Sequence, residues 1–191
     1  WHSTDGYTFK WAGKTLSDDL GDGKELQLTG SKTGAPTLIL SFVLYEEQAF
    51  VSFHNGIVNT QQEALQIKSF SPLSGTAYNG ASFNNFMLLD GESGEYNTRV
   101  LTGKDATELE SFNNILATFG KKGVPKNNLV IGGLSYHEFM KHAKVIKTED
   151  ALKIHLWSSD PVGKRVDPGK SYEFDQDRFY IDFITTSRFE S

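Results

Sequence analysis

The segment Thr37–Tyr45 most narrowly limits what this chain can fold into. If it is extended, both of its faces are apolar: one carries Leu38, Leu40, Phe42 and Leu44, and the other carries Ile39, Val43 and Tyr45. A strand that is apolar on both faces is expected in the middle of a sheet. Gln48–His54 follows after Glu46 and Glu47 and predicts a hairpin partner for it.

Further strands are predicted on both sides of this hairpin. Tyr7, Phe9 and Trp11 alternate with polar neighbours, as a half-buried strand requires. The runs 83–89 and 96–101 flank a turn-like segment and predict a second hairpin. In the run 59–68 a capping-box spacing favours a helix, but the alternation of Leu65 and Ile67 favours a strand, which we prefer. The first hundred residues therefore predict antiparallel β-structure.

Two helices are predicted in the second half. In 106–119 the apolar residues recur at three- and four-residue spacing, and Thr107 and Glu110 have capping-box spacing. The second helix is predicted to begin at Ser135, with Glu138 reaching back to the first turn. Strands are expected at 151–157 and 178–186, joined by a long polar loop at 158–169.

These elements predict a β-rich α+β fold. We expect a mostly antiparallel curved sheet or sandwich with two helices in the second half, because strands and helices do not alternate regularly. Residues 1–191 are predicted to form a single domain, since nothing near 102–107 has the composition of a flexible linker.

Composition excludes several chemistries. The chain of 191 residues has no cysteine, so it holds no disulfide, thiolate nucleophile or thiolate metal site. Its net charge of −5 and pI near 5.5 argue against a nucleic-acid partner. The segment 121–170 nevertheless carries ten Lys/Arg against five Asp/Glu, a local excess that could face an anionic partner.

The expected location is outside the cytoplasm. The longest apolar run, 38–45, is too short to cross a membrane, so no span is predicted. The chain begins with Trp1 and not with methionine, and it contains no basic segment followed by an apolar one, so we expect no signal peptide in it. We expect a processed or excised chain that is secreted or periplasmic.

No motif predicts a metal, a cofactor or a catalytic residue. His137 and His142 are five residues apart, whereas the zinc-protease helix requires four. The acidic turn at 18–25 lacks the full calcium-loop pattern, although a looser calcium site there stays open. Dispersed carboxylates such as Asp175, Asp177 and Asp182 leave a hydrolase or lyase as an alternative.

Binding is the predicted role. Trp157 lies opposite the apolar side of its predicted strand and just before the long loop, so we expect its ring to be exposed. Together with Lys164 and Arg165 it forms the predicted binding surface. The sequence thus favours a non-catalytic module that recognises a protein or glycan. The alternatives are a polysaccharide- or cell-wall-directed hydrolase or lyase and a structural assembly protein of a virion or appendage.

Overall fold

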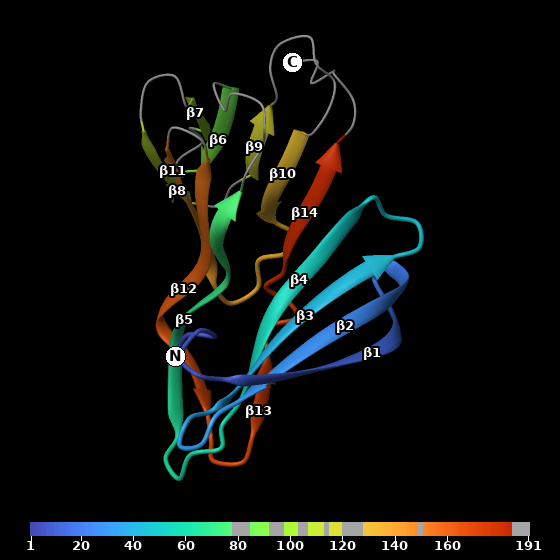
Figure 1. The fold of residues 1–191 in the computed structure, drawn as a ribbon, viewed down its shortest axis with the longest axis vertical. Coiled ribbons are helices and arrows are strands. Elements are labelled where there is room, and N and C mark those ends of the chain that lie inside the picture. Colours follow the sequence, from blue (N-terminus) through green and yellow to red (C-terminus); the bar gives the residue numbers. More distant parts are fainter. Residues whose placement is uncertain are drawn as a thin grey trace.

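The structure is a computed structural model that describes residues 1–77, 85–91, 98–102, 107–112, 115–119, 128–148 and 151–184. Its described part is all-β, and every strand pairing in it is antiparallel. The strands, labelled in Figure 1, are β1 (Thr8–Asp18), β2 (Gly21–Ser31), β3 (Thr37–Tyr45), β4 (Phe50–Val58), β5 (Leu65–Ala77), β6 (Asn85–Gly91), β7 (Thr98–Thr102), β8 (Glu108–Phe112), β9 (Ile115–Phe119), β10 (Asn128–Gly133), β11 (Met140–Lys147), β12 (Leu152–Val166), β13 (Ser171–Glu173) and β14 (Phe179–Ile184).

The strands form two sheets of unequal size. The ten-stranded sheet has the order β1-β2-β3-β4-β14-β10-β9-β6-β7, and β13 pairs with β4 beside it. The four-stranded sheet has the order β5-β12-β11-β8. Because the second sheet is so much narrower, it cannot cover the whole face of the first. Figure 1 shows β1, β2 and β3 extending away from β5 and β12.

The core lies where the two sheets face each other. Phe53 of β4 and Phe179 of β14 stack with 5.9 Å between ring centroids, and both are almost fully buried. Leu152, Ile154 and Leu156 of β12 belong to the same buried cluster. These three alternate residues share one face of the strand, so β12 presents its other face, with His155 and Trp157, away from this cluster.

The predicted central strand is confirmed. Thr37–Tyr45 is β3, and it pairs with β2 on one side and β4 on the other. Strand β4 supplies the predicted hairpin partner, and β6 pairs with β7 as the second predicted hairpin. The preference for a strand over a helix in 59–68 is confirmed from Leu65, where β5 begins.

The predicted helix over 106–119 is wrong. Glu108–Phe112 forms β8 of the small sheet, and Ile115–Phe119 forms β9 of the large sheet. Strand β8 pairs with β11, and β9 pairs with β6 and β10. These pairings provide the backbone N–H and C=O groups with the hydrogen bonds that a helix would have formed within itself. Tertiary pairing thus overrode the helical spacing of the apolar residues.

The predicted helix starting at Ser135 is also wrong. The Ser135 hydroxyl accepts a hydrogen bond from the Arg178 backbone N–H at 3.0 Å instead of capping a helix. The Asp177 carboxylate accepts hydrogen bonds from the backbone N–H groups of His137, Glu138 and Phe139. These bonds hold the segment in a bend. Strand β11 then begins at Met140. The fold class is therefore all-β in the described residues, not α+β with two helices.

The long loop predicted at 158–169 is a strand for most of its length. Strand β12 continues to Val166 and crosses an irregularity between Ser159 and Lys164, where its register with β5 shifts. The Asp160 carboxylate accepts hydrogen bonds from the N–H groups of Val162 and Gly163 there. Only the turn at 167–170 matches the predicted loop.

Candidate binding groove

A groove of about 830 Å³ lies along β5. Nine consecutive residues of this strand, Gln66–Ser74, line it, together with the N-terminal residues Trp1–Thr4. Figure 1 shows the N-terminus beside β5, where β1 crosses toward it from the large sheet. The facing wall is formed by apolar side chains of the large sheet: Phe9, Leu28, Leu38, Leu40 and Ile57.

Strand β5 is open on the side away from β12. Among the described strands it pairs only with β12 and forms one edge of the small sheet. An edge strand presents backbone N–H and C=O groups at regular intervals. The groove therefore combines an apolar wall with a row of polar backbone groups.

Trp157 of β12 contributes an indole ring to the groove, as Trp1 does from the N-terminus, and the Trp157 side chain is half-buried. It stacks on His142 of β11 with 4.8 Å between ring centroids and an interplanar angle of 8°. His155, two residues earlier, lies 5.0 Å away at 40°. The two imidazoles hold the indole in one orientation, in contrast to the freely exposed ring that the sequence predicted.

The groove also holds polar groups from both sheets. The Asn55 side-chain oxygen is buried and has no hydrogen-bond partner in the described structure. The Ser71 hydroxyl donates to the Leu156 carbonyl oxygen at 2.7 Å, and Ser69 and Ser74 add further hydroxyls to the lining. No Asp or Glu occurs among the described lining residues. These residues consequently offer hydrogen bonds but no carboxylate pair for acid–base catalysis.

Lys164 and Arg165 are not brought together with Trp157 in the groove. The Lys164 ammonium lies 2.8 Å from Glu138 Oε1 and 4.5 Å from the centre of the Tyr172 ring. Arg165 Nε lies 2.8 Å from Asp167 Oδ1. Both residues come directly after the irregularity in β12, and neither of them lines the groove.

Lys68 and His155 line the groove but were given no binding role from the sequence. The signal for Lys68 was the alternating pattern that placed Ile67 inside a strand, and the signal for His155 was its place on the same strand face as Trp157. Which edge of the sheet this strand would occupy depends on long-range pairing, so the lining residues were not predictable from local spacing.

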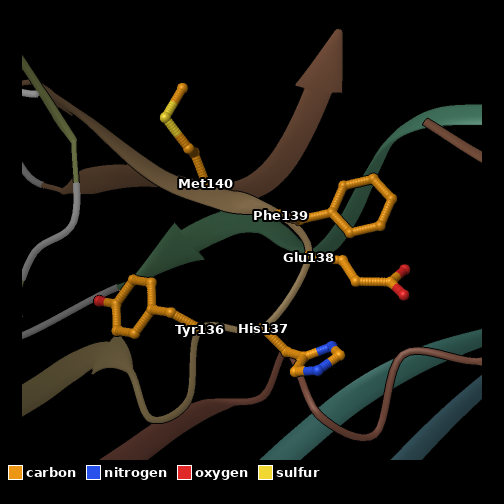
Figure 2. Close-up of a pocket in the computed structure, with 5 residues that line it drawn as sticks. All are labelled: Tyr136, His137, Glu138, Phe139 and Met140. Carbon is orange, nitrogen blue, oxygen red and sulfur yellow. The ribbon is translucent and has the colours of Figure 1, made fainter. Parts of the chain in front are cut away.

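A second, open hollow of about 480 Å³ is lined by Tyr136, His137, Glu138, Phe139 and Met140. Figure 2 shows Tyr136 extending to one side of this segment and His137 and Glu138 extending to the other. Reacting groups must converge on one point to act together. Because Tyr136 lies apart from His137 and Glu138, the three polar side chains of this hollow do not converge on one point.

Behind this hollow lies a buried ion pair. The Lys141 ammonium is fully buried, 3.6 Å from Asp177 Oδ1 and within 5 Å of the ring centres of Tyr136 and Phe179. Desolvation lowers the pKa of Lys141 to about 8, although Asp177 opposes that shift. The pair stabilises the bend before β11, and neither of its residues lines the groove.

The acidic turn predicted at 18–25 includes the end of β1, the two-residue connection 19–20 and the start of β2. Asp18 Oδ2 accepts hydrogen bonds from Arg178 at 2.8 Å and from the Tyr45 hydroxyl at 2.9 Å, and Arg178 also contacts that hydroxyl. Burial raises the pKa of Asp18, but the hydrogen bonds from Leu20 N–H, Arg178 and Tyr45 lower it overall. In the described ranges, no group of three or more His, Asp or Glu side chains is placed to hold a metal ion.

Asp175 and Asp177 do not act as a carboxylate pair. Asp177 is buried and engaged by backbone N–H groups, whereas Asp175 is exposed. Within the same described part of the chain, no helix has the length and apolar character needed to span a membrane.

No protein-family model and no curated protein matches the sequence. Solved structures do match in fold. They include the GH36 α-galactosidase AgaB from Geobacillus stearothermophilus (TM-score 0.60, 10% identity, 94% of this chain and 28% of that chain) and the α-galactosidase from Lactobacillus brevis (TM-score 0.60, 10% identity, 95% and 27%). The galactosidase domain of the α-galactosidase–sucrose kinase AgaSK is similar too (TM-score 0.62, 11% identity, 95% and 27%). The chain thus spans little more than a quarter of the length of these proteins and shares the fold of that part of them.

Proposed function

We propose that this chain is a non-catalytic β-sandwich module that binds a glycan in the groove along β5. The observation that carries the proposal is the fixed indole of Trp157 in a groove that also offers hydroxyl and amide groups. Ligand sites commonly combine aromatic and apolar walls with a few polar groups that set orientation. A sugar ring has an apolar face that can stack on an indole and hydroxyls that can bond to Ser and Asn side chains.

The similarity to α-galactosidases supports a setting in carbohydrate metabolism. In these proteins the shared fold makes up about a quarter of the chain. A module of this kind is therefore compatible with a larger carbohydrate-active protein. Fold alone does not assign function, which is why the proposal rests on the groove. The lack of carboxylates among the described lining residues favours binding over hydrolysis.

An extracytoplasmic location belongs to the same proposal. Polymeric glycans are met mainly outside the cytoplasm, so a secreted or periplasmic protein is the expected carrier. Fractionation of the producing cell, followed by detection of the chain with an antibody, tests this location. Recovery only in the cytoplasmic fraction would contradict it.

The test of binding is calorimetric titration with galactose-containing oligosaccharides such as stachyose. We expect Trp157→Ala to weaken binding at least fivefold, because it removes the stacking surface. Trp11→Ala is the matched control, since Trp11 is 74% exposed and does not line the groove. A parallel assay for released sugar should show no turnover. Equal losses in the two variants would contradict the assignment of the groove.

A protein partner is the second candidate, and a different surface favours it. Three apolar side chains of the large sheet that the small sheet does not cover are strongly exposed: Trp11, Leu26 and Leu44. Exposed apolar patches of this kind often mark protein contacts. Sedimentation at increasing concentration tests association through this face, and Leu44→Glu should abolish any dimer that it forms.

A further inference from the structure

We propose that the groove along β5 selects an extended, negatively charged glycan over a neutral one. This inference rests on the proposed function and deepens it by naming the ligand class. Two properties of the groove carry it: its charge, which differs in sign from that of the whole chain, and its length.

The charge of the groove is positive or neutral throughout its described lining. Lys68 and the histidines His2 and His155 line it, and no carboxylate does. The chain as a whole carries a net charge of −5, so a groove without acidic side chains departs from the average surface. In the ranges that the structure describes, no carboxylate pairs with Lys68, whose side chain is exposed. Its ammonium is thus available to a ligand.

The neighbouring strands β8, β11 and β12 carry both basic and acidic side chains near His155. Lys153 precedes His155 by two residues and therefore shares its face of β12, and Lys144 is the cross-strand neighbour of His155 on β11. The carboxylates nearest to His155 on this sheet, Glu108 and Glu110, are on β8 at the opposite edge from β5. Lys144 holds them at 2.5 and 3.8 Å. Because Lys144 is paired with these two carboxylates, it adds no net positive charge, and the positive character of the groove rests on Lys68.

The length of the groove points to a chain of several sugar units. Its lining includes nine consecutive residues of one strand, which span roughly 30 Å at the usual rise per residue. A single monosaccharide would contact only a small part of that length. A ligand that follows β5 could place an acidic group near Lys68 while a sugar ring stacks on Trp157.

The experiment compares three oligosaccharides of matched length by calorimetry: a neutral galacto-oligosaccharide, an oligogalacturonate and a sulfated galacto-oligosaccharide. We expect one or both anionic ligands to bind at least fivefold more tightly than the neutral one at 50 mM NaCl. Their advantage should shrink at 300 mM NaCl, because salt screens exposed charges. Preference for the uronate or for the sulfate identifies the source of the charge.

Variants of Lys68 test whether the groove provides this selectivity. Lys68→Gln should weaken anionic binding about two- to fivefold and leave neutral binding unchanged, the size expected for one exposed charge pair. Lys68→Arg should restore it. Lys10→Gln is the control, since Lys10 is exposed on β1 and does not line the groove.

The outcomes separate this inference from the proposed function. Equal binding of neutral and anionic ligands, with no effect of Lys68→Gln, would overturn the charge selectivity and leave glycan binding intact. Failure of all three oligosaccharides to bind would overturn both. Charge-selective binding that Lys10→Gln weakens as much as Lys68→Gln would overturn the assignment to this groove.

Discussion

The indole of Trp157 lies parallel to the imidazole of His142, with an angle of 8° between the ring planes and 4.8 Å between their centroids. The two residues face each other directly across β11 and β12. His142 Nε2 lies 2.7 Å from the Ser159 hydroxyl, which anchors the imidazole in turn. The candidate ligand surface is therefore positioned by the small sheet itself and not by a loop.

Protonation of the neighbouring histidines should be visible in the emission of Trp157. Burial lowers the pKa of His142 and of His155 below the usual value of 6.5. A protonated imidazole in contact with an indole quenches its fluorescence. In a chain with Trp1→Phe and Trp11→Phe, we expect emission to fall with a midpoint below pH 6.5. A midpoint above 6.5, or no transition, would show that the histidines are not buried against the ring.

Acid should destabilise the fold through His54. This side chain is almost fully buried, and desolvation lowers its pKa although Glu173, 3.4 Å away, favours the charged form. Between the lowered pKa and 6.5 the unfolded chain binds the proton more readily, so the free energy of unfolding falls as pH decreases through this window. Urea denaturation at pH 7.5 and 5 should show the loss, and His54→Gln should reduce it. An unchanged pH dependence in the variant would contradict this role.

Lys141 predicts a dependence of the same sign at alkaline pH. Its pKa is lowered to about 8 in the folded chain, so the unfolded chain binds more protons between pH 8 and the ordinary lysine range. The free energy of unfolding should rise across this window, by at most about 3 kcal/mol over its full width. Denaturation at pH 7.5 and 9.5 measures the rise. In Lys141→Met it should be absent, and a rise of equal size in that variant would assign it to another group.

The irregularity in β12 depends on Gly163. Its φ of 77° is in the left-handed region, and a Cβ atom there would lie 2.5 Å from the Ile67 carbonyl oxygen of β5. Gly163→Ala should cost about 1–3 kcal/mol in the free energy of unfolding. Gly75→Ala in β5 is the control, because a Cβ atom at Gly75 meets nothing within 4 Å. Equal stability of the two variants in urea would mean that the irregularity tolerates a side chain.

The β-structure of the first hundred residues was predictable because its signals are local. Strand β3 is apolar on both faces and is indeed central, with β2 and β4 beside it. The alternation in β1 is equally local, although the structure leaves nearly all of this strand exposed and not half-buried. The antiparallel architecture could therefore be inferred from the sequence.

The two helices were mispredicted because their signals are not unique to helices. Leu109 and Ile115 fit one helical face, yet they lie on β8 and β9 in different sheets. The capping pattern at Ser135 and Glu138 is instead used in tertiary contacts: Ser135 bonds to Arg178, and Glu138 bonds to Lys164 and Tyr172. Only long-range pairing decides between these outcomes, and local spacing does not contain it.

Part of the lining of the candidate groove could be predicted from the sequence. Trp157 was singled out because it alternates with the apolar residues of its strand, and it does line the groove. Lys164 and Arg165 were grouped with it on the assumption of a single loop, but β12 continues through them and each has its own acidic partner. The opposite wall, from β1 to β4, is distant in sequence and left no local signal.

The most direct test of glycan binding in the groove uses the three tryptophans as built-in reporters. Trp1 and Trp157 line the groove, whereas Trp11 does not. In a ¹⁵N-labelled chain, their indole N–H groups give separate NMR signals that can be followed during titration with an acidic oligosaccharide. We expect the Trp157 signal to shift and saturate while that of Trp11 stays in place. A titration that leaves Trp157 unmoved, or that shifts only Trp11, would contradict it.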